Sequence, residues 1–327
     1  MRFDPFFQYR PWGGRRLADV LSIALPGEDL VGEAWILSDR DEHSSVVANG
    51  SLKGMSLGQL VNQWPQQLLG DGRGAFKRFP LLLKFLDVRA ALSVQVHPSD
   101  RQTKYLPAGE SGKTEAWVVL GTGQDSLIYA GLVSHTTPDE LRESLARDAV
   151  TDHIASFVPS VGDAVFIRAG TVHSLRDLVI FEVQENSNVT FRLYDWNQID
   201  PKTGQHRALQ IEQAMACIDF TQGAIAPAVP VVQQREPALR ERLFDCQHFR
   251  LSRVHTKSPF TVGSAGAPRV LVCIAGEGHV RHNGVEFRFS AGDVLLLPAE
   301  VGVCLCRPSG NVELLEISLP DRPPSQG

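Results

Sequence analysis

The sequence has few cysteines, and their spacing excludes one common kind of metal site. Its five cysteines are an odd number, and none of them forms the Cys-x-x-Cys pair by which thiolates usually hold structural zinc. Cys304 and Cys306 lie two residues apart in an apolar run, a spacing typical of core residues in a strand. We therefore expect reduced thiols in a cytoplasmic protein.

The chain also lacks a strong charge of either sign and any long apolar run. Its formal net charge is −5 and its pI is about 6.1, so no overall positive field favours nucleic acid or an anionic membrane. No stretch approaches the roughly 18 apolar residues of a spanning helix, and the N-terminus has no apolar signal-like segment. We predict no nucleic-acid and no membrane partner, and a phosphorylated ligand would need a local cluster of Lys and Arg.

What the sequence does contain is many short segments rich in Val, Leu, Ile and Phe, often ended by Gly, Pro, Asn or Asp. We predict strands over residues 81–86, 91–97, 116–120, 126–130, 163–168, 178–184, 189–194, 269–275, 285–289, 293–298 and 312–318. Helical spacing is confined to residues 56–69, 137–149 and 208–218. Pro65 should interrupt the first of these helices. Many strands and few helices indicate an all-β fold with helical additions.

Two stretches of the chain repeat the same order of turns and strands. A strand ending at Gly121-Thr-Gly123 precedes a Gly162-Asp turn, and a strand ending at Gly276-Glu-Gly278 precedes a Gly292-Asp turn. This order resembles that of a cupin, a double-stranded β-jelly-roll. We therefore expect two cupin-type β-jelly-roll bodies.

The proline-containing segment 221–237 has little periodicity and is predicted to be a linker between these bodies. The predicted N-terminal body, with helical insertions, covers residues 1–220, and the C-terminal body covers 238–327. In the second body, Val270 and Val303 stand where the first has Glu115 and His173. We therefore predict that the second body is a degenerate, metal-free copy.

A pair of polar side chains interrupts the apolar strand at residues 92–97. Strand side chains alternate between two faces, so Gln95 and His97 point the same way. Burying both costs free energy, which either a metal ion or hydrogen bonds within the core would offset. In a jelly-roll, Glu115 and His173 would lie on the same inner wall. Nitrogen and oxygen donors without thiolate suit Zn²⁺, and also Mn²⁺, Fe²⁺, Co²⁺ or Ni²⁺.

Each of these residues also has a simpler interpretation. Glu115 could be a surface carboxylate beside Lys113, and His173 a histidine in the loop that follows Gly170. The four donors together, at this spacing, favour a metal site over four unrelated roles.

Seven blocks follow one another along the chain: Trp12–Gly14, Gly32–Ser38, Pro80–Asp87, Leu92–Asp100, Gly112–Trp117, Ala169–His173 and Asn186–Trp196. In this order they resemble a type I mannose-6-phosphate isomerase of the shorter bacterial kind, a member of the cupin superfamily. The resemblance extends over residues 12–218, whereas the last third matches only as a degenerate cupin. Two positions depart from the family pattern: Arg168 replaces a proline, and Gln210 stands where a histidine is usual. Both departures concern loop rigidity and fine specificity more than the reaction.

The resemblance implies one zinc ion per chain, with ligands that fall on Gln95, His97, Glu115 and His173. It also implies an active site with three basic residues: Lys84, Lys113 and Arg192. From the residues alone, Lys84 and Lys113 could equally be solvated. Arg192 lies mid-strand in an apolar context, where its charge needs an anionic partner, either Glu182 or the substrate.

The activity implied by the resemblance is the interconversion of mannose 6-phosphate and fructose 6-phosphate through a cis-enediolate. Two alternatives remain open: a non-catalytic metal-binding cupin that senses or binds a sugar phosphate, and an Fe²⁺ oxygenase. A glutamine ligand with several cations nearby argues against the oxygenase. The sequence does not identify the base that moves the C2 proton, nor does it decide between a monomer and a homodimer.

Overall fold

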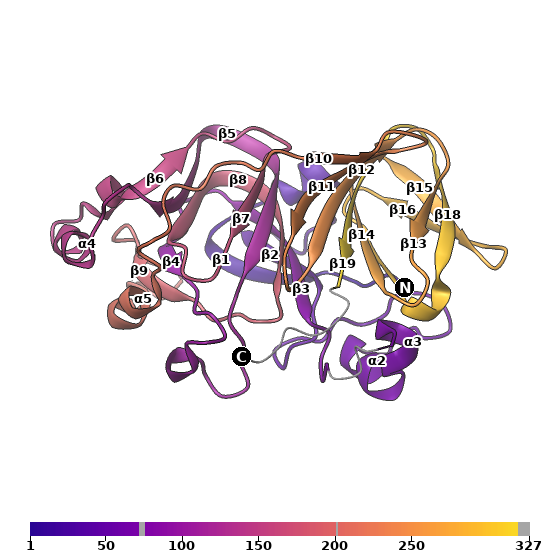
Figure 1. The fold of residues 1–327 in the computed structure, drawn as a ribbon, viewed down its shortest axis with the longest axis horizontal. Coiled ribbons are helices and arrows are strands. Elements are labelled where there is room, and N and C mark those ends of the chain that lie inside the picture. Colours follow the sequence, from indigo (N-terminus) through magenta and orange to yellow (C-terminus); the bar gives the residue numbers. More distant parts are fainter. Residues whose placement is uncertain (72–75, 201, 320–327) are drawn as a thin grey trace.

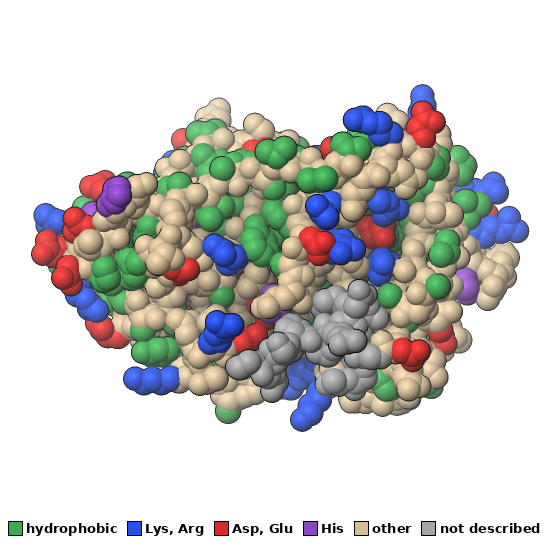
Figure 2. All heavy atoms as spheres, in the orientation of Figure 1, with side chains coloured by type: hydrophobic (Ala, Val, Ile, Leu, Met, Phe, Trp, Pro, Cys, Tyr) green, Lys and Arg blue, Asp and Glu red, His purple; other side chains and the backbone are tan. Residues whose placement is uncertain are grey.

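The computed structural model describes residues 1–71, 76–200 and 202–319, and it is built mostly of β-strands. Two bodies lie side by side (Figure 1), the N-terminal one drawn in indigo to magenta and the C-terminal one in orange to yellow. Among the described residues, no helix combines the length and the apolar character needed to cross a membrane. Figure 2 shows acidic and basic side chains interspersed over the visible face, without a region of one sign.

Among its described residues, the N-terminal body contains nine strands and five short helices. Its strands are β1 Phe6–Gly14, β2 Val31–Leu37, β3 Leu81–Val88, β4 Val94–Val96, β5 Glu115–Leu132, β6 Ile154–Phe157, β7 Ala164–Ile167, β8 His173–Glu185 and β9 Phe191–Tyr194. Its helices are α1 Leu17–Leu21, α2 Leu57–Gln63, α3 Pro65–Leu69, α4 Pro138–Leu145 and α5 Ile211–Cys217, with 3-10 turns η1 Thr103–Tyr105 and η2 Val150–His153.

Up to residue 319, where the described part of the chain ends, the C-terminal body is formed by the remaining strands and one 3-10 turn. These are β10 Val231–Gln234, β11 Leu239–Asp245, β12 Arg250–Thr256, β13 Phe260–Gly263, β14 Arg269–Ala275, β15 Glu277–His282, β16 Val285–Ser290, β17 Val294–Leu297, η3 Ala299–Val301, β18 Val303–Pro308 and β19 Val312–Ser318. The segment expected to be a linker therefore includes β10, which pairs with β11. Residues 320–327 of the predicted second body lie outside the described residues.

The strand pairings follow the same order in the two bodies. In the first, β1, β2, β3, β8, β5 and β7 are antiparallel neighbours in that order. In the second, the order of the six-stranded sheet is β10, β11, β12, β19, β14 and β17. In each body the fourth strand in this order, β8 or β19, comes late in the sequence, so both orders contain a crossover between distant segments.

Most predicted elements are present, with shifted ends. The expected helix 56–69 is split at Trp64-Pro65, as the proline predicts, because Pro lacks the N–H that would continue the helix. The two expected strands 116–120 and 126–130 are one long strand, β5, whose pairing with β8 shifts register at two places. Strands β1 and β2 were not predicted, since β1 carries Pro11 and β2 is buried on both faces without alternation.

One hydrophobic core runs through both bodies. Val118 and Phe181 of the first body belong to the same buried cluster as Leu251, Val272 and Ile317 of the second. Burying each such side chain contributes about 1.5–3 kcal/mol. The N-terminal residues cross to the second body as well, where Arg2 forms a 2.5 Å ion pair with Asp293. The two bodies are therefore joined by a packed interface.

Candidate active site

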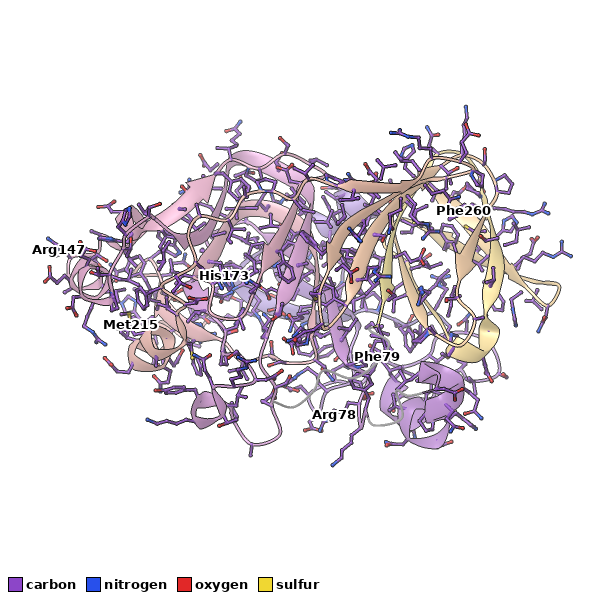
Figure 3. The ribbon with its side chains drawn as sticks, viewed as in Figure 1. Arg78, Phe79, Arg147, His173, Met215 and Phe260 are labelled. Atoms are coloured by element: carbon purple, nitrogen blue, oxygen red, sulfur yellow. The ribbon has the colours of Figure 1, made fainter. Side chains whose placement is uncertain are left out.

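The ends of three neighbouring strands bring the predicted metal donors together. Gln95 of β4 lies directly opposite His173, the first residue of β8, and opposite Arg192 of β9 on its other side. Directly opposed residues of antiparallel strands project from the same face. Glu115 is the first residue of β5, which also pairs with β8. His173 accordingly lies among the strands of the N-terminal body in Figure 3.

The side chains of these residues converge within metal-binding reach of one another. His173 Nε2 is 3.4 Å from Glu115 Oε1, and His97 Nε2 is 3.7 Å from the same oxygen. The donor atoms of these three buried residues all lie within 4.8 Å of one another. Gln95 Nε2 is 3.1 Å from His173 Nε2, so half a turn of its terminal amide would direct Oε1 toward the same point. This donor set, of two imidazoles, one carboxylate and one amide, fits a zinc-type site.

Hydrogen bonds on the far side of each ring fix the histidine tautomers. His97 Nδ1 lies 2.8 Å from the carbonyl of Val189, and His173 Nδ1 lies 2.9 Å from the carbonyl of Thr171. Because a carbonyl only accepts, each Nδ1 carries the hydrogen and each Nε2 presents a lone pair. His97 Nε2 and Glu115 Oε1 are buried and have no hydrogen-bond partner. An unpartnered lone pair on both atoms is what a cation between them would use.

The protonation states suit a cation as well. Burial, followed by the charge of Lys113, lowers the pKa of His97 to about 3, and burial also lowers the pKa of His173. Burial alone would raise the pKa of Glu115, but Lys113 and His97 hold it well below its usual range. Two neutral imidazoles and an ionised carboxylate are the forms that bind metal ions.

Two of the three predicted basic residues, Lys113 and Lys84, are buried in the same body as the metal donors. Lys113 Nζ is 2.7 Å from Glu115 Oε2, and its side chain is buried. Lys84, on β3, is also buried, with Nζ 3.2 Å from Glu182 Oε1 and 3.7 Å from Glu33 Oε2. The two lysines are therefore not solvated surface residues.

The two acidic partners of Lys84 were not identified as site residues from the sequence. Burial would raise the pKa of Glu33, but Lys84 and then Arg10 hold it at about 2. Glu182 differs: burial raises its pKa above the usual range. Trp117 connects the Lys84–Glu182 pair with the metal donors. Its Nε1 donates to Glu182 Oε2 at 3.1 Å, and its ring meets that of His173 edge-on, with the ring centres 5.4 Å apart. The available signal was a single carboxylate within an otherwise apolar run, Glu33 in β2 and Glu182 in β8.

Arg192 has a different environment from the lysines. Glu182, its suggested structural partner, contacts Lys84 and Trp117 instead. Within the described part of the chain, the Arg192 guanidinium forms no ion pair with a carboxylate, and its buried Nε has no hydrogen-bond partner. Burial, then the charge of Arg207, lowers its pKa. A cation left without a partner inside a protein is available for an anionic ligand.

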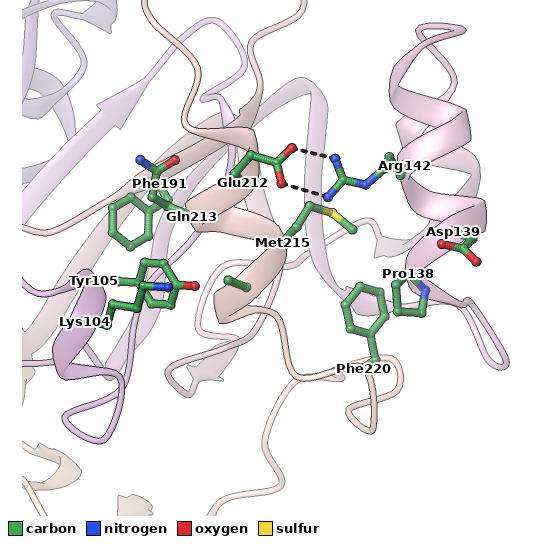
Figure 4. A pocket seen from close by; sticks show the side chains of 11 residues that line it. Lys104, Tyr105, Pro138, Asp139, Arg142, Phe191, Glu212, Gln213, Met215 and Phe220 are labelled. Carbon is green, nitrogen blue, oxygen red and sulfur yellow. Dashed lines mark hydrogen bonds and ion pairs between the residues drawn. The ribbon is translucent and has the colours of Figure 1, made fainter.

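A hollow of about 870 Å³ lies outside this site, between α4 and α5 (Figure 4). Phe191, Met215 and Phe220 line it, and an ion pair between Arg142 and Glu212 crosses it. None of the predicted site residues lines this hollow. Phe191 faces it, so the next residue along β9, Arg192, points to the opposite face, toward Gln95.

Two valines of the second body stand at positions predicted to correspond to metal donors of the first. Val270 is buried in β14, whereas Val303 is 59% exposed at the start of β18, where the next residue, Cys304, is buried. Their correspondence to Glu115 and His173 stays a prediction. A hollow of about 210 Å³ lies between this body and the N-terminal segment; Met1 and Leu52 line it on one side, and Val280, His282 and Leu295 on the other.

The chain is similar over nearly its whole length to characterised proteins. The family model described as phosphomannose isomerase type I, catalytic domain, matches residues 1–115. Mannose-6-phosphate isomerase ManA of Bacillus subtilis is 31% identical over 306 residues, covering 92% of this chain and 93% of that protein. Mannose-6-phosphate isomerase of Streptococcus mutans is 32% identical over 290 residues, or 88% of each protein.

A solved structure extends this similarity to the fold. The crystal structure of the mannose 6-phosphate isomerase from Bacillus subtilis superimposes with a TM-score of 0.88 at 25% identity, covering 97% of this chain and 98% of that one. With similarity of this degree over so much of its length, the chain belongs to the family of type I mannose-6-phosphate isomerases.

Proposed function

We propose that this protein is a metal-dependent aldose–ketose isomerase that interconverts mannose 6-phosphate and fructose 6-phosphate. One observation carries the proposal beyond family membership: Gln95, His97, Glu115 and His173 meet on one inner wall, with buried cations beside them. A metal-binding sensor would need the donors but not Lys84, Lys113 and Arg192 together.

The four donors would hold one divalent metal ion, and zinc suits them best. When bound, the ion would supply positive charge where negative oxygen develops during the reaction. Lys113 would hold the Glu115 carboxylate in its ionised form through their 2.7 Å contact. The carbonyl contacts behind His97 and His173 would fix the two rings in the orientation that the ion requires.

The reaction also needs a group that moves a proton between carbon atoms, and Glu182 has the properties of one. It is buried, its pKa is raised by that burial, and it is connected through Trp117 to the metal site. A carboxyl group whose pKa is raised exchanges protons with a substrate more readily than an ordinary surface carboxylate does. Lys84, 3.2 Å from Glu182 Oε1, would stabilise its ionised form.

Arg192 is the proposed anchor for an anionic group of the substrate. It shares a face with Gln95 and has no carboxylate partner among the described residues. A guanidinium offers a planar pair of donors that matches a phosphate or an enediolate oxygen pair.

For the fold, we propose two cupin-type jelly-rolls, of which the C-terminal one is a degenerate copy without metal. The matching order of six neighbouring strands in each body supports this. We place the catalytic body at 1–220 and the second body at 238–327.

A coupled assay tests the proposed reaction. Purified protein is given mannose 6-phosphate, and fructose 6-phosphate is detected before and after treatment with a chelator, and again after zinc is restored. We expect turnover that is lost with the metal and recovered with it. Tight binding of the sugar phosphate without turnover would favour the sensor.

A further inference from the structure

The turn between β11 and β12 carries a histidine of the C-terminal body into contact with the N-terminal body. We propose that His248, in this turn, is a positioning residue for the segment that holds Lys113 and Glu115. The proposal rests on the function assigned above, and it gives the C-terminal body a part in the catalytic site of its neighbour.

Three consecutive hydrogen bonds connect the two bodies at this point. Gln247 Nε2 donates to His248 Nε2 at 2.7 Å, which leaves the ring hydrogen on Nδ1. His248 Nδ1 lies 3.0 Å from Glu185 Oε2, so that hydrogen is donated to the Glu185 carboxylate. The other oxygen, Glu185 Oε1, accepts the backbone N–H of Thr114 at 2.8 Å. His248 and Glu185 are both more than nine-tenths buried.

Thr114 is the residue between Lys113 and Glu115, so its backbone position sets both side chains. The backbone N–H of Glu185 also donates to the Thr114 carbonyl at 3.1 Å, which clamps the peptide from both sides. The neighbouring Lys113 N–H donates to the carbonyl of Pro98 at 3.0 Å. A shift of about 1 Å in a group that contacts the reacting atoms can cost a hundredfold in rate. The clamp on Thr114 is therefore the point at which the second body controls the site.

The turn that presents His248 is itself rigid. The next residue, Phe249, is fully buried in the core shared by the two bodies and meets Phe166 of β7 edge-on at 6.5 Å. Cys246 N–H donates to the carbonyl of Phe249 at 3.0 Å and closes the turn. Because its base is fixed, the imidazole can hold Glu185 in one orientation.

Asp100 also lies near this pair, and its donor atoms with those of Glu185 and His248 all fall within 4.8 Å of one another. The hydrogen bonds argue against a metal ion there. Both Glu185 oxygens and both His248 nitrogens already have partners, and Asp100 Oδ1 accepts the Gly112 N–H at 2.7 Å. Asp100 thereby fixes a further part of the same segment.

The test compares His248→Ala with His248→Asn in the full-length, metal-loaded protein. Asparagine places its amide nitrogen near the position of Nδ1 and can still donate to Glu185, whereas alanine cannot. His279→Ala is the matched control, because His279 pairs at 3.4 Å with Glu286 within the C-terminal body alone. The two readouts are hydrogen exchange at the Thr114 amide and steady-state isomerase kinetics.

We expect His248→Ala to speed exchange at Thr114 and to lower kcat by about 10-fold or more with little change in KM, as loss of an outer partner of a catalytic group typically does. His248→Asn should keep most of the wild-type kcat and most of the protection of the Thr114 amide from exchange. His279→Ala should change neither kcat nor exchange at Thr114. Unchanged exchange and unchanged kcat in His248→Ala, or equal losses in the Ala and Asn variants, would overturn the proposal. If the wild-type protein proves not to be an isomerase, exchange at Thr114 still decides whether His248 holds this segment.

Discussion

Replacing Arg192 by alanine separates a substrate-binding arginine from a structural one. No described carboxylate pairs with Arg192, and its Nε lies buried without a partner. Removing the side chain therefore leaves no carboxylate unpaired, and we expect the free energy of unfolding to stay within about 1 kcal/mol of wild type. If the guanidinium binds the substrate anion, kcat/KM should fall at least about 100-fold, which corresponds to roughly 2.7 kcal/mol of transition-state stabilisation.

A nearby arginine provides the control. Arg207 binds Asp195 through two hydrogen bonds, and Asp195 is buried. Arg207→Ala leaves that carboxylate unpaired and should cost about 3 kcal/mol of stability. Chemical denaturation and steady-state kinetics on the same preparations measure both effects, and Arg192→Lys should recover only part of the activity. If Arg192→Ala is strongly destabilised yet nearly fully active per folded molecule, Arg192 does not serve the substrate.

Two further predictions concern the metal donors and the buried acids. His97→Ala and Glu115→Ala each remove one donor of about four, so bound zinc and activity should fall together; full metal occupancy with normal turnover would show that the donor set is wrong. Glu33 has a pKa of about 2 in the folded protein, against 4.5 for an ordinary glutamate. A lowered pKa stabilises the fold above pH 4.5, and this contribution, about 3 kcal/mol, is lost as the pH falls toward 2. Glu33→Gln should remove that part of the acid sensitivity, as unfolding free energies measured from pH 5 to pH 2 would reveal; an unchanged pH dependence would contradict it.

The elements predicted from the sequence are those whose spacing of polar and apolar residues matches which of their side chains are buried in the structure. Helix α4 falls within the predicted range 137–149, and Thr137 and Glu140 cap its start reciprocally, a feature that needs only four neighbouring residues. Strand β2 was not predicted, because burial of all its residues hides the alternation that marks a strand. Register shifts within β5 are set by its pairing with β8, which no local pattern contains.

The residues of the candidate site also fall into two groups: those that a sequence pattern or motif predicts, and those that depend on contacts between distant segments. The donors Gln95 and His97 follow from alternation within one strand, and the resemblance to a family supplies Glu115 and His173. Contacts between side chains far apart in sequence could not be predicted. Glu182 pairs with Lys84 rather than Arg192 because β3 and β8 are neighbours, and a single chain does not reveal which strands are adjacent.

Titrating zinc into metal-free protein tests the central claim most directly, with bound metal and mannose 6-phosphate isomerase turnover measured in the same samples. If one site at His97, Glu115 and His173 carries the activity, turnover should rise in proportion to bound zinc and reach its plateau at one ion per chain. Full turnover in the metal-free protein, or a plateau reached only at two ions per chain, would contradict the account.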